Sequence, residues 1–135
     1  MPIRTWIEKN GITLREITGN IILEELLEAL KTISDYPDFQ KGMPSLWDLR
    51  NASVSKLSND DLYKLRDFIS HNAERRGGNF KVAYVASRDL KYGVSRMLGF
   101  ILKADPSCSR RTFRSMAEAI EWVKTPLEDG WEADE

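Results

Sequence analysis

The sequence predicts one α/β domain with a mixed, mostly parallel sheet, an N-terminal β-hairpin and helices packed on it. Segments with strand-like apolar patterns alternate along the chain with segments whose apolar residues recur every three or four positions, as in helices. The pair Asn10-Gly11, a strong signal for a two-residue hairpin turn, separates the first two strands. Strands that alternate with helices favour right-handed crossovers, so the order β-β-α-β-α-β-α-β-α predicts parallel strands beside an antiparallel edge.

The first half of the chain supplies the hairpin and one helix. Two strands with alternating side chains are predicted at Pro2–Glu8 and Ile12–Thr18. A helix is predicted over Leu23–Ser34, because its apolar residues form one stripe and its acidic residues gather near its start. Pro37 cannot continue a helix and is expected to end this segment.

The second half alternates three strands with three helices. Strands are predicted at Ser45–Leu49, Phe80–Ser87 and Arg110–Arg114, and the continuous apolar run of the second predicts an interior strand. Helices are expected from near Ser58 to Arg76, from Arg88 to Lys103, and from Ser115 through Val123. Ser115 and Glu118 match a capping box, and close packing is expected at Gly93 and Gly99.

Composition narrows the class of protein. The 135 residues suit one domain, predicted over residues 1–125, followed by an acidic tail over residues 126–135. A net charge of -1 argues against a nucleic-acid partner. With Cys108 and His71 as the only cysteine and histidine, we expect no disulfide, no metal site and no other cofactor. No long apolar run predicts a membrane span or a signal peptide, so we expect a cytoplasmic protein.

Several segments together resemble the SpoIIAA-like family of bacterial proteins, which has a STAS-type fold related to anti-sigma-factor antagonists. These segments are "ITGNIILEELLEAL", "LWDLRNA", "KVAYVASRDLKYGVSRMLGF" and "RTFRSMAEAIEWV". The resemblance covers about residues 3 to 124. It implies a non-enzymatic regulatory or protein-interaction module. The family is also likened to the CRAL-TRIO lipid-transfer fold, which implies the alternative of a carrier for a lipid or other small apolar ligand.

Ser58 is the residue on which the resemblance bears most directly. In regulatory STAS proteins a strand ending in Asp-Leu precedes a loop with Asp-Ser-Ser-Gly, whose second serine is phosphorylated. Counted from Asp48-Leu49, Ser58 takes that position, while the other three loop residues are replaced by Lys56, Leu57 and Asn59. The residues themselves predict a helix cap, with the Ser58 side chain accepting a hydrogen bond from the backbone of Asp60 or Asp61. Both a cap and a phosphorylation-controlled switch are retained as hypotheses.

A second candidate site follows from the topology. Ligands of open α/β sheets gather at the carboxyl ends of the strands. Asp48, Arg50, Ser87 and Arg88 are expected at that end, where they are predicted to line a rim for a small anion or a partner; capped helices and solvated charges are the alternative. No set of residues predicts catalysis, so we expect that the protein is not an enzyme.

Two further expectations concern partners. The alternation of Ile3, Ile7, Ile12 and Leu14 in the hairpin predicts pairing or face packing with another copy, and therefore a homodimer. The alternative function, a carrier, predicts an apolar cavity beneath the helix that contains Gly93 and Gly99.

Overall fold

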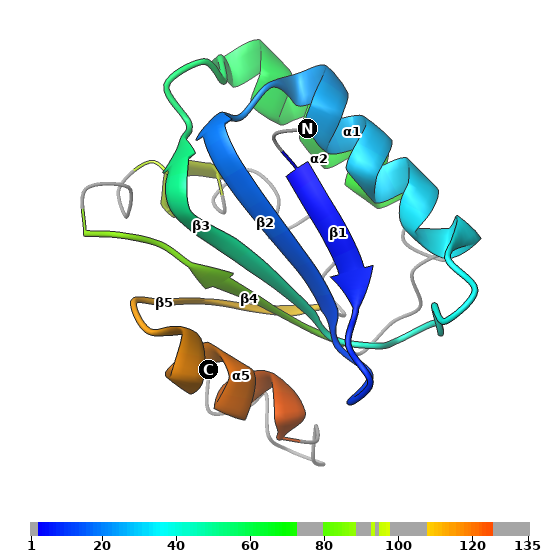
Figure 1. The fold of residues 1–135 in the computed structure, drawn as a ribbon. Coiled ribbons are helices and arrows are strands. Elements are labelled where there is room, and N and C mark those ends of the chain that lie inside the picture. Colours follow the sequence, from blue (N-terminus) through cyan, green and yellow to red (C-terminus); the bar gives the residue numbers. More distant parts are fainter. Residues whose placement is uncertain (1–2, 73–79, 89–92, 94, 98–107, 126–135) are drawn as a thin grey trace.

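A computed structural model of the chain describes residues 3–72, 80–88, 93, 95–97 and 108–125. These residues form a five-stranded sheet in the order β1-β2-β3-β4-β5, with helices on both faces (Figure 1). The strands are β1 Ile3–Ile7, β2 Thr13–Asn20, β3 Ser45–Ser53, β4 Lys81–Val85 and β5 Ser109–Phe113. The helices are α1 Leu23–Thr32, the short 3₁₀ helix η1 Ile33–Asp35, α2 Asn59–His71 and α5 Met116–Lys124.

The sheet is mixed and mostly parallel, as the sequence predicts. β1 pairs with β2 antiparallel, whereas the three pairs from β2 to β5 are parallel. All five residues of β4 are buried, and β4 lies between β3 and β5. The expectation of an interior strand in this segment is therefore confirmed, because its apolar run is covered on both faces.

Each face of the sheet has its own apolar core. α1 and α2 cover one face, where Leu23, Leu26, Leu62 and Leu65 join a cluster with residues of β2, β3 and β4. α5 covers the other face, where its residues Ala119 and Val123 pack with a second cluster on the strands (Figure 1). Alternate residues of one strand point to opposite faces, so a single short strand contributes to both cores.

The hairpin is present, but its turn differs from the predicted one. The Glu8 N–H donates to the Ile12 carbonyl (2.9 Å) and the Gly11 N–H donates to the Glu8 carbonyl (2.9 Å), which closes a loop of three residues rather than two. Gly11 has a φ of 84° and takes the left-handed position that such a loop needs. The longer loop shifts the strand register by one residue.

β3 extends beyond its predicted end. The sequence predicts a strand over Ser45–Leu49, whereas β3 continues to Ser53 beside β2. The register with β2 shifts between Glu16/Asp48 and Thr18/Asn51, so β3 contains one more residue than β2 in this interval. This β-bulge falls at Leu49–Arg50, and bulges redirect side chains near the ends of strands.

The helix ends follow local capping rules. α1 ends at Thr32 and continues as η1, so the predicted end at Ser34 is two residues too long for an α-helix. The Ser115 side chain accepts a hydrogen bond from the Glu118 N–H at the start of α5, which confirms the Ser115 half of the predicted capping box. The predicted extension of the second helix to Arg76, most of the predicted helix over Arg88–Lys103 and the tail over residues 126–135 lie outside the described residues.

Candidate functional site at the carboxyl end of the sheet

The parallel strands bring three connecting segments to one end of the sheet. The connection after β2 lies beside the end of β3, because the Ile21 N–H donates to the Ser53 carbonyl (2.8 Å). Ser87 and Arg88 directly follow β4, whose last residue Val85 is the register partner of Asp48 in β3. All five residues that the sequence proposed as a site therefore belong to this end of the sheet.

The segment Ser53–Ser58, which we call the carboxyl-end loop, is held in place by contacts with the core and with neighbouring residues. Leu57 is 5% exposed and belongs to the core beneath α1 and α2. Its N–H donates to the Val54 carbonyl (3.0 Å), and its own carbonyl accepts from Arg96 Nη2 (3.1 Å). A Cβ at Gly93 would collide with the Val54 side chain, so a larger residue at Gly93 does not fit. The loop is thus held by a buried side chain, a turn and a close contact.

The outward side of the same loop is polar and exposed. Ser55, Lys56 and Ser58 are exposed to solvent. The Ser53 and Ser55 hydroxyl oxygens lie 3.0 Å apart, and the Ser55 N–H donates to Ser53 Oγ (3.3 Å). An exposed loop on a rigid scaffold is the usual location of binding residues, and here the scaffold fixes the loop through Leu57.

Ser58 caps α2, which confirms the cap that its sequence context predicts. Its side-chain oxygen accepts from the Asp61 N–H (3.0 Å), while the Asp61 carboxylate accepts from the Ser58 N–H (3.1 Å). This reciprocal arrangement is a capping box, in which aspartate replaces the more usual glutamate. The Ser58 hydroxyl is exposed, so the cap does not hide it from solvent.

Asp48 and Arg50 form a two-pronged ion pair. Arg50 Nε donates to Asp48 Oδ1 and Arg50 Nη2 donates to Asp48 Oδ2, both at 2.9 Å, and the Arg50 N–H also donates to Oδ1 (3.2 Å). The two residues are two positions apart in β3, next to the bulge. The hydrogen bonds from Arg50 lower the pKa of the Asp48 carboxyl, against the opposing effect of burial.

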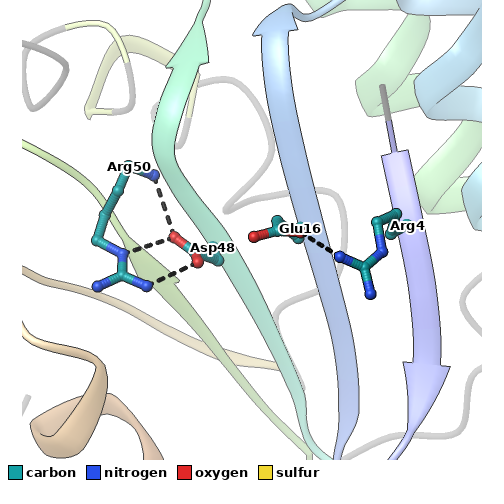
Figure 2. A network of polar contacts seen from close by, with 4 residues as sticks. All are labelled: Arg4, Glu16, Asp48 and Arg50. Carbon is teal, nitrogen blue, oxygen red and sulfur yellow. Dashed lines mark hydrogen bonds and ion pairs between the residues drawn. The ribbon is translucent and has the colours of Figure 1, made fainter. Parts of the chain in front are cut away.

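A second ion pair beside this one was not predicted from the sequence. Glu16 is the register partner of Asp48, and its carboxylate accepts from Arg4 Nη1 of β1 (3.0 Å). Figure 2 shows the four side chains in a row across three strands, with the two acids in the middle and each turned toward its own arginine. The Arg4 guanidinium also lies 5.1 Å from the centre of the Trp6 ring.

These contacts limit what the predicted rim can bind. Both carboxylate oxygens of Asp48 already accept hydrogen bonds, and two guanidinium nitrogens of Arg50 are committed to them. An incoming anion would have to compete with a bidentate carboxylate, which is among the stronger partners for arginine. Ser87 is half-buried and Arg88 is exposed at the same end of the sheet. Anion binding by this rim stays a prediction.

Two exposed apolar side chains lie at the starts of the helices that flank the loop. Ile22, the N-cap residue of α1, is 44% exposed, and Tyr63 in the second turn of α2 is 48% exposed. They are the exposed large apolar residues of the described part of the chain. The Arg66 guanidinium lies 5.0 Å from the centre of the Tyr63 ring. Neither residue was identified from the sequence, because the helical pattern alone does not distinguish exposed from covered side chains at these positions.

The opposite, amino end of the sheet contains a buried amine. Lys81 is 3% exposed, and its Nζ donates to the Trp122 carbonyl of α5 (2.9 Å) and lies 4.8 Å from the centre of the Trp122 ring. Burial lowers the pKa of Lys81, and the neighbouring charge of Arg111 lowers it further. Beside Lys81 is an open pocket of about 370 Å³, between the hairpin turn, residues 42–44 and the end of α5.

Neither a metal site nor a membrane-spanning helix is found among the described residues. The described residues contain no group of three or more histidine, cysteine, aspartate or glutamate side chains that could hold a metal ion. Within the same part of the chain, no helix has the length and apolar character needed to cross a membrane.

Comparison with known proteins places the fold. No protein-family model matches the chain, and no curated protein matches it. A solved structure of an uncharacterised protein of the DUF3478 family from Shewanella loihica PV-4, described as having a SpoIIAA-like fold, is similar over 90% of this chain and 91% of its own. The sequence identity is 15% and the TM-score is 0.56. The chain therefore has a SpoIIAA-like fold, as the sequence resemblance implied.

Proposed function

We propose that this protein is a non-enzymatic regulatory or protein-interaction module of the STAS type. The observation that carries the proposal is the anchored carboxyl-end loop beside two exposed apolar side chains. Leu57 holds the loop in the core, while Ser55 and Lys56 face solvent. A partner protein would contact the loop together with Ile22 and Tyr63.

The chemistry of this surface supports a protein partner over a small polar substrate. Tyrosine is enriched at the centres of interfaces, where it combines a large contact area with a hydrogen-bonding group. Ile22 and the Tyr63 ring would supply the apolar area of such an interface, and the exposed Ser55 and Lys56 would supply polar groups. An apolar centre with a polar rim is the usual composition of a protein interface.

The alternative function, a carrier of a lipid or other small apolar ligand, stays a prediction. It places its cavity beneath the helix predicted over Arg88–Lys103, most of which lies outside the described residues. The pocket beside Lys81 is at the other end of the sheet and is open, so it does not correspond to that cavity.

A photo-crosslinking experiment tests the proposed surface. A photoreactive amino acid at Lys56 in the loop is expected to capture a partner from the native host, whereas the same group at Lys9 in the hairpin turn is not. Ile22→Glu and Tyr63→Glu should each reduce the captured partner at least tenfold, since each puts a charge into an apolar contact. Capture that is equal at Lys56 and Lys9, or unaffected by both substitutions, would contradict the proposal.

Ser58 is proposed as a cap first and a regulatory position second. A phosphate on its exposed hydroxyl would be favoured by the start of α2 but would meet the carboxylate of Asp61, which already occupies the cap. Ser58→Asp should therefore keep the helix stable, because aspartate also caps helices. If Ser58→Asp releases the crosslinked partner while Ser58→Ala retains it, the switch takes precedence over the cap; retention by both variants supports the proposed order.

A further inference from the structure

The two edges of the sheet differ in whether they can pair with a second copy. β1 forms one edge, and within the described residues its strand partner is β2 alone. The backbone hydrogen bonds of the described loops and turns do not involve residues 3–7, so none of these segments pairs with the outer edge of β1. An uncovered edge offers a row of backbone donors and acceptors to another strand.

The sequence of β1 is complementary to itself in the antiparallel direction. When two copies of β1 are centred on Thr5, Ile3 lies opposite Ile7 of the second copy, Arg4 opposite Trp6, and Thr5 opposite Thr5. Residues directly opposite each other in antiparallel strands share a face of the sheet. The pairs are therefore apolar with apolar, cation with aromatic ring, and threonine with threonine.

Arg4 and Trp6 already contact each other within one copy. The Arg4 guanidinium already lies 5.1 Å from the centre of the Trp6 ring of its own chain. The Arg4 side chain is 69% exposed, and Trp6 is half-buried at the margin of the core beneath α5. In the pair of copies, each Arg4 guanidinium would lie beside the Trp6 ring of the other chain. A cation–π contact of this kind is favourable, and arginine makes it more often than lysine.

Other registers of the same edge are less favourable. A pairing centred on Arg4 would place the two Arg4 side chains opposite each other, which is repulsive. A pairing centred on Trp6 would align only three of the five residues of β1. A two-fold axis perpendicular to the sheet keeps each face of β1 on the same side in both copies. A register that places an odd-numbered residue opposite an even-numbered one is therefore excluded, because the two side chains would point to opposite faces.

The opposite edge lacks this property. β5 consists of Ser-Arg-Arg-Thr-Phe, so the corresponding antiparallel pairing, centred on Arg111, places two Arg111 side chains opposite each other. Like charges directly opposite in a sheet are destabilising. The two edges have the same length, but in the pairing centred on the middle residue Arg111 faces Arg111 at the β5 edge, whereas Thr5 faces Thr5 at the β1 edge.

We infer that two copies of the protein associate through antiparallel pairing of their β1 strands, centred on Thr5, into a continuous ten-stranded sheet. This interface goes beyond the proposed partner surface and is separate from it, because it uses the side edge of the sheet rather than the carboxyl end. It also refines the hairpin-based expectation of a homodimer. Ile12 and Leu14 are 2% and 9% exposed inside their own chain, so face packing through them is not available.

Cysteine crosslinking of the full chain tests the register. Opposite residues in antiparallel strands have Cα atoms about 4.5–5.5 Å apart, within the range of a disulfide. Under mild oxidation Thr5→Cys should form a covalent dimer. Arg4→Cys and Trp6→Cys should not link to themselves but should link to each other when mixed. Lys9→Cys, exposed in the hairpin turn, is the control for random collision, and the native Cys108 is buried.

Each alternative gives a different result. Self-linking of Arg4→Cys or of Trp6→Cys alone would overturn the Thr5-centred register in favour of one of the other two. Sedimentation of the unmodified chain should show a dimer fraction that rises toward high micromolar concentration; a monomer throughout would overturn the interface itself. If the chain with the photoreactive group at Lys56 stays monomeric but still captures a partner, the β1 interface is overturned and the proposed function stays intact. The two proposals therefore fail separately.

Discussion

The carboxyl and amino ends of the sheet differ in how they hold a buried charged side chain. At the carboxyl end, Asp48 is held by a bidentate arginine, and its carboxyl pKa is lowered because the partner favours the charged form. At the amino end, Lys81 is buried beneath α5, and its pKa is lowered because burial disfavours the charged form. The same direction of shift thus has opposite consequences: the charge of Asp48 stabilises the fold, and the charge of Lys81 opposes it.

The ion pair of Asp48 and Arg50 therefore stabilises the carboxyl end, whereas the buried charge of Lys81 is a cost that the rest of the fold offsets. The carboxyl end carries an exposed loop whose position depends on a few anchors. At the amino end, the buried amine of Lys81 donates a hydrogen bond to the Trp122 carbonyl and so joins α5 to β4. Substitutions at four positions test this contrast.

The largest effect is expected from the anchor of the carboxyl-end loop. Leu57→Ala removes a buried side chain from the core beneath α1 and α2, so the free energy of unfolding should fall by about 2–5 kcal/mol. Chemical denaturation measures this loss. Lys56→Ala, at the exposed neighbouring position, is the matched control and should change stability by less than about 0.5 kcal/mol. Equal effects at the two positions would show that Leu57 does not anchor the loop.

The next effect concerns the paired carboxylate. Arg50→Ala leaves Asp48, whose side chain is 10% exposed, with only its backbone donor, and should cost about 1–3 kcal/mol at neutral pH. The lowered Asp48 pKa means that this stabilisation is present above the unfolded-state value, about 3.9, and is lost as the pH falls through the lower folded-state value. Denaturation curves of wild type and Arg50→Ala should therefore converge in acid.

Arg50→Lys sharpens the same test. Lysine keeps the positive charge but cannot reproduce the two parallel hydrogen bonds of the guanidinium. We expect a stability between those of wild type and Arg50→Ala. If Arg50→Lys equals wild type, charge alone accounts for the pair and the fork geometry contributes nothing measurable.

A smaller effect is expected at the start of α2. Ser58→Ala removes the side-chain half of the capping box and should lower the free energy of unfolding by about 1 kcal/mol. Thermal melting measures this change. Ser55→Ala, in the same loop but outside the cap, is the control. A loss at Ser55 as large as that at Ser58 would point to a general effect on the loop instead of helix capping.

Some of these features follow from the sequence and others depend on geometry that the sequence does not fix. β4 was predicted because the run from Val82 to Val85 is continuously apolar, and the cap of α2 because Ser58 comes shortly before two aspartates. The Arg4–Glu16 pair was missed, because a two-residue turn at Asn10-Gly11 would place Arg4 opposite Ile17. The bulge at Leu49–Arg50 has no local signal such as a glycine. One residue of register therefore decided which charges meet.

The smallest effect, and the one that isolates the amino end, is a change in pH dependence at Lys81. Because the folded-state pKa is below the unfolded value of about 10.4, the unfolded chain binds more protons between these two values, and stability should rise with pH across that window. Lys81→Met keeps most of the side-chain stem but carries no titrating amine, so it should lack this rise. At neutral pH the two proteins should differ little, since the variant loses both the burial cost of the charge and its bond to the Trp122 carbonyl. Denaturant unfolding of both proteins from neutral to alkaline pH gives two curves of stability against pH. Subtracting one curve from the other removes the contributions of the titrating groups that both proteins share. Parallel curves would mean that Lys81 is not penalised by burial, and the contrast between the two ends of the sheet would fail at this end.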